Sequence, residues 1–483
     1  MLQTTGGGAA LATMGALAGC SGGGGGGGDE GGNGGGGGND GGGGGSTSGS
    51  TDNVTLEIWL SYYTEGETKK KYTDKLVKQA ENDLGMTINI TGVPYTDVEK
   101  KFQSARAAGN TPDMVEVMTR PGILAGGAGL VVNDLWESSS LADKTSEKIM
   151  SGHEVWGAQS TGEKGNLVSM PLGFRPYLTC WRTDWLDQAG IDKTEVNHEA
   201  GSLHWKDDMP GIYQKLQQTD LGKQKNHWPD TTGMKQSDEE YMSLYIPQYG
   251  GSLSGVVDVT GSKATINSQA GLDAIGMQVD YIDKGYFSSR SINSGDEEST
   301  TMHWAGQIAC NHIQDSTDLW GDYHEEQPQK TKNGLYTWGV PMNGGTKAAL
   351  AWLPSLGFIK SSLGGNQAKQ DAAMKFIEYW VGDPENSVNN AKNLGFVPVV
   401  PEDIQNKDYF GQTDIYKEFW RGAAAKTLNE FKPSVIPAVP GASAITYEIP
   451  RKMHQRILSN GVPVKEAADK AAEEINQVLQ RNK

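Results

Sequence analysis

The feature that most constrains the fold is an alternation of strand and helix patterns between residues 54 and 118. The strand patterns, in which apolar and polar side chains alternate, cover residues 54–60, 86–93 and 113–118. The helical patterns cover residues 68–84 and 97–108, and each ends at a glycine that can cap the helix. Strands and helices in this order build a largely parallel sheet, so the sequence predicts the α/β class.

The same two patterns continue towards the C-terminus. Further strands are predicted at residues 167–172, 177–181, 338–341 and 351–359. Further helices are predicted at residues 184–189, 205–219, 267–284, 367–381 and 464–479. Because ligands on α/β sheets bind beyond the carboxyl ends of the strands, the loops at 61–65 and 118–122 lie on the candidate binding edge.

Glycine divides the 483-residue chain into two parts of different composition. Of the 66 glycines, 25 lie in the first 50 residues. A tract this poor in apolar side chains cannot bury a core. We therefore expect residues 21–53 to form a disordered, flexible tether and the folded body to begin at residue 54.

Charge and cysteine content exclude several classes of protein. The formal net charge of -17 gives no basic footprint for a phosphate backbone, so we expect no nucleic-acid partner. The acidic excess would fit a haloarchaeal organism that lives at high salt. The chain has no run of 18 apolar residues, so no membrane-spanning helix is predicted. Three cysteines are too few for a disulfide framework or a cysteine-based zinc site.

The N-terminal residues have features of a signal that directs a protein out of the cytoplasm. Residues 9–19 are apolar, and Leu17, Ala18 and Gly19 lead directly into Cys20. This resembles a lipobox, in which the cysteine is lipidated and becomes the mature N-terminus, so residues 1–20 are predicted to be a lipoprotein signal segment. No Lys or Arg precedes Lys69, and the segment resembles the end of a twin-arginine signal whose basic pair lies upstream. The alternative is a disordered terminus with an inert cysteine.

Motifs of common catalytic centres are absent from the sequence. There is no nucleophile elbow, P-loop or dinucleotide-binding glycine pattern, and no second histidine follows His153 and Glu154 at metalloprotease spacing. Paired carboxylates are adjacent in sequence, so they diverge on regular elements, although a glycosidase dyad formed across a cleft is left open. We expect no catalytic residue, no metal and no cofactor.

Aromatic side chains are plentiful, with 13 Trp and 17 Tyr. Aromatic faces stack on the C–H faces of sugars, and they also fill protein cores. Trp59 and Trp380 lie on apolar faces and are assigned to the core. Tyr62, Tyr63 and Trp352 fall in loops at strand ends, so they are candidates for either role.

Five segments, in this order, carry a family resemblance. They are residues 107–113, 129–135, 170–173 with 181–191, 306–309 and 371–380. From residue 54 to the C-terminus the chain resembles the extracellular solute-binding proteins of carbohydrate ABC transporters (family 1), the group that includes maltodextrin-binding proteins. The resemblance implies a periplasmic-binding-protein-like fold of the class II type, with two α/β lobes and a ligand cleft between them.

The resemblance also implies where the lobes begin and end. Crossings are expected near residues 171–174, 340–343 and 396–399, each of which contains a proline. Lobe 1 would comprise residues 54–171 plus 342–396. Lobe 2 would comprise residues 172–341 plus 397–483.

Transferred by position, the resemblance implies a set of ligand-binding residues: Tyr62, Tyr63, Glu65, Arg120, Phe174, Arg175, His312, Asp315 and Trp352. The aromatic members would stack on sugar faces and Asp315 would accept hydrogen bonds from hydroxyls. Arg120 and Arg175 would donate in bidentate fashion, which would suit an acidic sugar or a sugar phosphate. Alternatively, each arginine forms an ion pair within the protein.

The function implied by the resemblance is binding without catalysis. The protein would close on a sugar or oligosaccharide and deliver it to the permease subunits of an ABC importer. It would act as a monomer, lipid-anchored at Cys20 on the outer, extracellular face of the cytoplasmic membrane. Two alternatives stay open, a binding protein for a non-sugar solute and a surface-anchored glycoside hydrolase.

Overall fold

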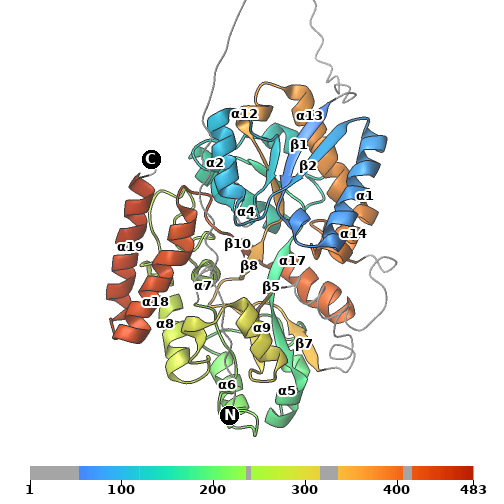
Figure 1. Ribbon diagram of the computed structural model, residues 1–483. Helices are drawn as coiled ribbons and strands as arrows, with labels where there is room; N and C mark the ends of the chain where they lie inside the picture. The colour runs from blue at the N-terminus through green and yellow to red at the C-terminus, as the bar shows by residue number, and fades with distance from the viewer. Residues whose placement is uncertain (1–53, 119, 235–240, 316–334, 406–415, 482–483) are drawn as a thin grey trace, which may run out of the picture. The chain divides into compact units, whose positions relative to one another are not determined.

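The computed structural model describes residues 54–118, 120–234, 241–315, 335–405 and 416–481, which all fall in one compact unit (Figure 1). These residues contain two β-sheets. The tether at 21–53 and Cys20 lie outside the described residues. The expectations for those segments therefore remain predictions.

The first sheet has the strand order β2-β1-β3-β9-β4. Its strands are β1 (Thr55–Leu60), β2 (Thr87–Gly92), β3 (Met114–Glu116), β4 (Ser169–Pro171) and β9 (Ser355–Phe358). β1 pairs in parallel with β2 and β3, as the alternation of strands and helices predicts. β9 runs antiparallel to β3 and β4. The chain enters β9 directly from the second sheet, without the crossover helix that a parallel connection needs.

Helices cover this sheet, and the predicted ones begin and end close to the expected residues. They are α1 (Glu67–Leu84), α2 (Val98–Ala108), α3 (Asn133–Glu137), α4 (Glu147–Thr161), α12 (Lys360–Leu363), α13 (Gln367–Ile377), α14 (Pro384–Leu394) and α15 (Pro401–Ile404). α1 ends at Gly85, whose φ of 68° is the left-handed conformation that glycine adopts without a Cβ penalty. The sequence patterns did not predict α4 or α14.

The second sheet has the strand order β10-β8-β5-β6, and β7 also pairs with β5. Its strands are β5 (Arg175–Arg182), β6 (Cys310–Asp315), β7 (Tyr336–Gly339), β8 (Ala348–Trp352) and β10 (Lys432–Ser434). β5 is antiparallel to β6, β7 and β8, and only β10 and β8 are parallel. The parallel pairing predicted from residues 54–118 therefore does not extend to this half of the chain.

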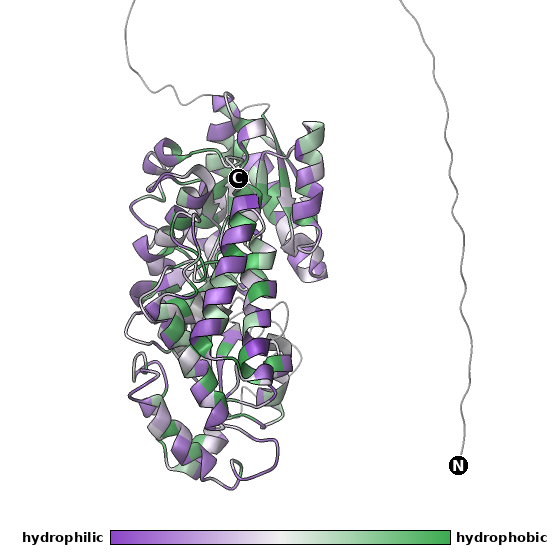
Figure 2. Cartoon of the chain, turned by 90° about the vertical axis from the view of Figure 1, so that its left-hand side faces the viewer, coloured by the Kyte–Doolittle hydropathy of each residue, from purple (hydrophilic) through white to green (hydrophobic). Residues whose placement is uncertain are grey.

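The helices around the second sheet are α5 (Thr183–Ala189), α6 (Met209–Gln217), α7 (Tyr241–Gln248), α8 (Gln269–Asp283), α9 (Asp296–Trp304), α17 (Ala425–Glu430), α18 (Ile449–Asn460) and α19 (Val464–Arg481). α18 and α19 lie side by side (Figure 1). Hydrophilic and hydrophobic residues are interleaved along α19 (Figure 2). Its buried residues recur every three or four positions, because one face packs inward: Ala467, Ala468, Ala471, Ala472, Ile475 and Leu479.

The chain passes between the sheets through short extended segments that are bonded to one another. Phe174 and Val397 exchange two backbone hydrogen bonds of 2.9 and 2.8 Å, and the Leu172 amide donates to the Pro354 carbonyl at 2.7 Å. The predicted single strand at 351–359 is instead two strands, β8 and β9, which end and begin on either side of Leu353 and Pro354. Residues 348–352 therefore pair in the second sheet, whereas the sequence-based boundaries place 342–396 with lobe 1.

Candidate functional site

The candidate site lies at the carboxyl ends of β1 and β3, the edge that topology indicated. A 3-10 turn, Tyr62–Thr64, follows β1, and Arg120 with a second turn, Pro121–Leu124, follows β3. Glu116, the last residue of β3, joins the two connections. Its Oε2 accepts hydrogen bonds from the amides of Ser61 (2.6 Å) and Tyr62 (3.2 Å).

The Glu116 carboxyl is buried, with only 2% of its surface exposed. Burial raises its pKa to about 7, and the negative charge of Glu65 acts in the same direction. The two amide donors and the positive charge of Arg175 oppose this rise. The site therefore contains a carboxyl group that changes charge near neutral pH.

Arg120 connects the two halves of the molecule, by which we mean the first sheet with its helices and the second sheet with its helices. Its Nη1 donates a hydrogen bond of 3.3 Å to the hydroxyl of Tyr447, which belongs to a π-helical turn, Ala444–Glu448, that leads into α18. The guanidinium carbon lies 5.8 Å from the ring centre of Tyr95 and 5.7 Å from that of Tyr447. These distances are within the range of cation–π attraction. The arrangement is a planar cation between two aromatic rings from opposite halves.

The space beside this contact is nearly closed. A cavity of about 10 Å³ is lined from the first half by Glu99, Arg120, Pro121 and Gly122 and from the second by Ile436, Ala442, Ser443 and Tyr447. That volume is about what one water molecule needs. A molecule larger than water could therefore enter only if the two linings separate.

A second aromatic group lies at the start of β5. Arg175 is paired with Trp352 in the β5–β8 ladder. The Trp352 indole nitrogen donates to the Tyr177 hydroxyl at 3.0 Å, and the two rings are tilted with centroids 6.4 Å apart. Arg175 reaches back to the first half, where its Nη1 lies 3.7 Å from the sulfur of Met118.

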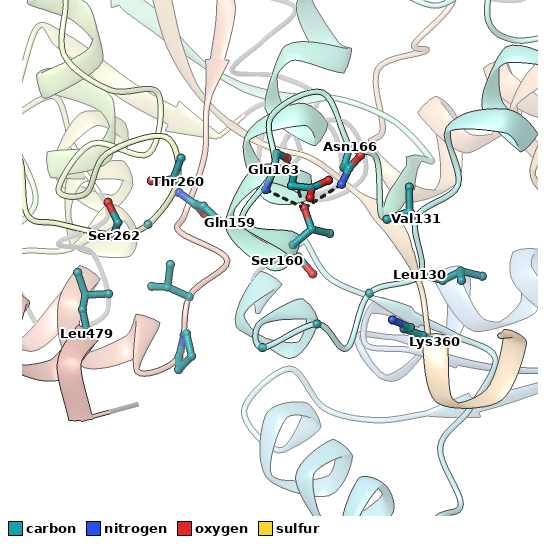
Figure 3. A pocket seen from close by; sticks show the side chains of 18 residues that line it. Leu130, Val131, Gln159, Ser160, Glu163, Asn166, Thr260, Ser262, Lys360 and Leu479 are labelled. Carbon is teal, nitrogen blue, oxygen red and sulfur yellow. Dashed lines mark hydrogen bonds between the residues drawn. The ribbon is translucent and has the colours of Figure 1, made fainter. Parts of the chain in front are cut away.

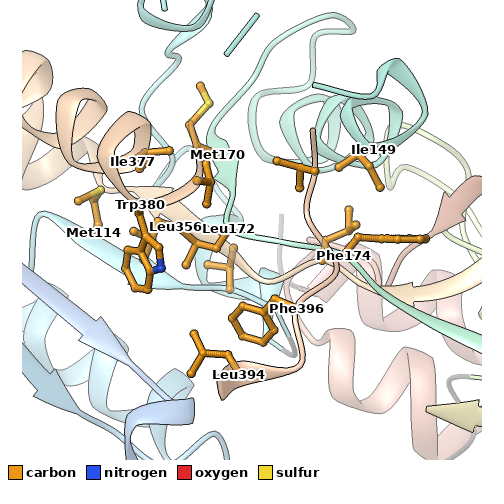
Figure 4. Packing of buried hydrophobic residues seen from close by; sticks show 14 of the residues in the cluster. Met114, Ile149, Met170, Leu172, Phe174, Leu356, Ile377, Trp380, Leu394 and Phe396 are labelled. Atoms are coloured by element: carbon orange, nitrogen blue, oxygen red, sulfur yellow. The ribbon is translucent and has the colours of Figure 1, made fainter. Parts of the chain in front are cut away.

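Two of the predicted aromatic ligand residues are buried. Tyr62 is 1% exposed and meets Phe396 edge to face, with ring centroids 5.5 Å apart. Phe174 is 0% exposed and belongs to the same apolar cluster, which also contains Phe396 and Ile149 (Figure 4). Neither ring has a face open to a sugar in this structure, because both faces are used in packing.

His312 is also internal, with 3% of its surface exposed. Its Nδ1 lies 2.8 Å from Oδ2 of Asp230 and its Nε2 lies 2.5 Å from the Tyr245 hydroxyl. Its ring stacks on Phe287 with centroids 5.3 Å apart. Both nitrogens and one ring face are therefore occupied by the protein itself.

The other predicted residues lie nearer the surface or outside the described part. The half-buried Tyr63 donates to Asp74 at 2.5 Å and accepts from Lys70 at 2.9 Å. Glu65 is exposed and pairs with Lys69 at 2.7 Å. The backbone of Asp315 is opposite Tyr177 in the β5–β6 ladder, and its side chain falls outside the described atoms.

Sequence reasoning missed four residues of this site: Tyr95, Glu116, Tyr177 and Tyr447. Tyr95 had a usable signal, because it follows the predicted strand 86–93 and is an aromatic residue in a loop on the binding edge. Tyr447 had none, since it comes from a helical segment whose approach to Arg120 depends on the tertiary fold.

A larger groove is lined from both halves of the molecule, with Thr260 and Ser262 among its residues from the second half. Its volume is about 710 Å³, and its lining includes Lys360, Glu163 and Leu479 (Figure 3). It borders the N-terminal end of β3, because Leu130 bonds to Phe358, the partner of Met114. No aromatic residue lines it among the described residues. It therefore offers fewer stacking faces than the region around Arg120 and Arg175, where Tyr95, Trp352 and Tyr447 lie.

The described residues contain no group of three His, Cys, Asp or Glu side chains that could hold a metal ion. Within the same residues, no helix is both long enough and apolar enough to cross a membrane.

Sequence and structure comparisons give one consistent result. A family model described as "Bacterial extracellular solute-binding protein" matches residues 75–414, more than half of the chain. No curated protein matches. Many solved structures do match.

Three of these structures illustrate the likeness. The sugar-binding protein MalE from Xanthomonas citri has a TM-score of 0.67 at 14% identity, over 89% of this chain and 98% of that one. The cyclic alpha-maltosyl-1,6-maltose binding protein from Arthrobacter globiformis has a TM-score of 0.63 at 16% identity, over 89% and 100%. A solute-binding protein from Agrobacterium radiobacter K84, in complex with ribitol, has a TM-score of 0.60 at 16% identity, over 88% and 99%. The chain therefore has the two-lobed α/β fold of periplasmic binding proteins.

Proposed function

Because the chain belongs to the bacterial extracellular solute-binding protein family, we propose that it is the substrate-binding component of an ABC importer and that its solute is a sugar or oligosaccharide. Structures of the same fold include proteins described as binding maltosyl sugars, acarbose and ribitol, which supports a polyhydroxylated solute. Aromatic rings with polar tips at the candidate site suit such a solute, since they stack on C–H faces and bond to hydroxyls.

The observation that carries this proposal is the position of Arg120 between Tyr95 and Tyr447, which come from opposite halves of the molecule. A solute inserted there would contact both halves at once. The planar guanidinium offers donors to hydroxyl or carboxylate oxygens, and the rings offer stacking faces. We propose that Arg175 and Trp352 form a second part of the same site, while Tyr63, Glu65 and Asp315 remain candidates at its border.

The proposed mechanism is binding with hinge closure and without turnover. The cavity of about 10 Å³ beside Arg120 is far smaller than the several hundred Å³ of usual ligand pockets. Solute entry therefore requires the two halves to separate, and closure then buries the solute. The permease would distinguish the loaded from the empty protein, because the solute shifts the population towards its preferred state.

The proposal extends to the cellular setting. Cys20 would carry the lipid anchor, and residues 21–53 would tether the body at the outer face of the cytoplasmic membrane. Export by the twin-arginine route and a monomeric state belong to the same proposal.

A thermal-shift screen tests the function. The purified protein is heated with maltose, trehalose, ribitol, glucuronate and glucose 6-phosphate, each in separate samples. A solute at 100 times its Kd stabilises the folded state by about 2.7 kcal/mol, which shifts the melting temperature by several degrees. A shift with unchanged solute after incubation supports binding without catalysis, whereas released product would support the hydrolase alternative. No shift with any of these solutes would contradict the sugar proposal.

A further inference from the structure

We infer that Glu116 is a positioning residue: its carboxyl group holds the loop Ser61–Glu65 against β3 in the conformation that the solute needs. The inference rests on the proposed function for its link to solute, but its structural part can be tested without any solute.

The first step is the geometry of the loop. One oxygen of Glu116 accepts both the Ser61 and the Tyr62 amides. The carbonyls of these two residues in turn accept the amides of Thr64 and Glu65, each at 3.0 Å. The whole 3-10 turn is therefore bonded to β3 through one side chain. A shift of Ser61 and Tyr62 would move every residue of the turn.

The second step is the surroundings of the carboxyl. The charged and titratable groups that face it are Glu65 and Tyr62 from the loop and Arg175 from β5. Burial and the charge of Glu65 disfavour the ionised form more than the two amides and Arg175 favour it, and the pKa is raised to about 7. A neutral carboxyl can still accept both amides with its carbonyl oxygen.

The third step gives the sign of the effect. If the loop moves away, water reaches the carboxyl and its pKa falls towards the ordinary value of 4.5. The ordered loop is therefore the state that binds the proton more tightly. Ordering is favoured at pH 5 and is progressively lost as the pH rises through 7. A solute that needs the ordered loop should follow the same dependence.

The test without solute uses the full chain labelled with ¹⁵N-tyrosine. The Tyr62 amide signal is identified by its loss in Tyr62→Phe. We expect this signal to titrate with a midpoint near pH 7 in the wild type and to show no titration between pH 5.5 and 8.5 in Glu116→Gln. Glu65→Gln should lower the midpoint, because it removes a negative charge that faces Glu116. A wild-type signal that does not titrate, or a titration that persists in Glu116→Gln, would overturn the inference.

The test with solute uses the sugar of the panel that gives the largest thermal shift. We expect the wild-type Kd to rise about three- to tenfold from pH 5.5 to 8, since a pKa difference of one unit is a tenfold change. Glu116→Gln, which mimics the protonated form, should keep the low Kd at both pH values. The matched control is Glu163→Gln, an exposed carboxylate that lines the larger groove, which should follow the wild type. A Glu116→Gln profile like that of the wild type would contradict the inference.

If no sugar binds, the proposed function fails, and the amide titration still decides the role of Glu116 in the loop.

Discussion

Arg120 donates a hydrogen bond to the hydroxyl of Tyr447 across 327 positions of the sequence. The two residues belong to opposite halves of the molecule, and their contact closes the space where we propose that a solute binds. Entry of a solute at this place would break the contact, because the cavity beside it holds no more than about one water molecule. Arg120 is therefore the residue whose substitution should reveal the site most directly.

Replacement of Arg120 should weaken sugar binding. Arg120→Ala removes both the donors and the cation between the two rings, and we expect a loss of about 1.5–3 kcal/mol, or more than tenfold in Kd. Arg120→Lys keeps the charge but loses the planar fork, so it should restore little of the affinity. Isothermal titration calorimetry measures both. Arg106→Ala, an exposed arginine on α2, is the control and should bind as the wild type does.

Substitution of Tyr95 should change sugar affinity without changing the stability of the fold. Its side chain is 47% exposed, so Tyr95→Ala should change the free energy of unfolding by no more than about 0.5 kcal/mol. Sugar affinity should nevertheless fall, because one stacking face beside Arg120 is lost. Val131, the other large exposed apolar residue in the described part of the chain, is 45% exposed and lines the larger groove, so Val131→Ala should change neither quantity. Equal sugar affinity in Tyr95→Ala and the wild type would remove Tyr95 from the site.

Phe174 should behave as a core residue. Removal of a fully buried phenyl ring leaves a cavity, and we expect Phe174→Ala to cost about 3–5 kcal/mol in denaturant unfolding. Phe174→Leu fills most of the space, so it should cost less and still bind sugar. If both variants instead unfold like the wild type but lose sugar binding, the ring contacts the solute, as the sequence suggested.

Glu116 should also affect the pH dependence of stability. Its pKa is about 7 in the folded protein and 4.5 when solvated, so the unfolded state loses its proton first as the pH rises. Stability contributed by the bound proton therefore falls from pH 4.5 to pH 7, by roughly 3 kcal/mol for this group. Glu116→Gln should lack this fall. Urea unfolding at pH 5 and pH 8 gives the comparison, and an equal fall in both proteins would contradict the assigned ionisation.

The N-terminal order of elements could be predicted because each element carries its own local signal. The alternation in β1 and the apolar spacing of α1, ended by Gly85, depend only on neighbouring residues. The split between β8 and β9 carried only Pro354 as a local signal, and a proline does not say which partner each part of the run takes. Residues 351–359 read as one apolar run, and only pairing with different partners separates them at Leu353 and Pro354.

The candidate site was predictable as an edge but not as a set of side chains. Topology places the loops after β1 and β3 together, and Arg120, which the family resemblance implied as a ligand residue, lies in the second of these loops. It does not say which way a side chain points. Tyr62 turns inward against Phe396 while its neighbour Tyr63 bonds to Asp74 nearer the surface, and no sequence period separates the two.

The position of β9 determines when the first sheet can form during synthesis. β3 and β4 each pair with β9, and β9 lies between them in the sheet. Until residue 358 has left the ribosome, these two strands have no partner on that side, and the exposed edges of incomplete sheets favour association with other chains. Pairing over such a sequence separation is also slow. The nascent chain should therefore depend on chaperones for most of its translation, and it can acquire its native first sheet only after the segment that carries the second sheet's strands β5 to β8 has been made.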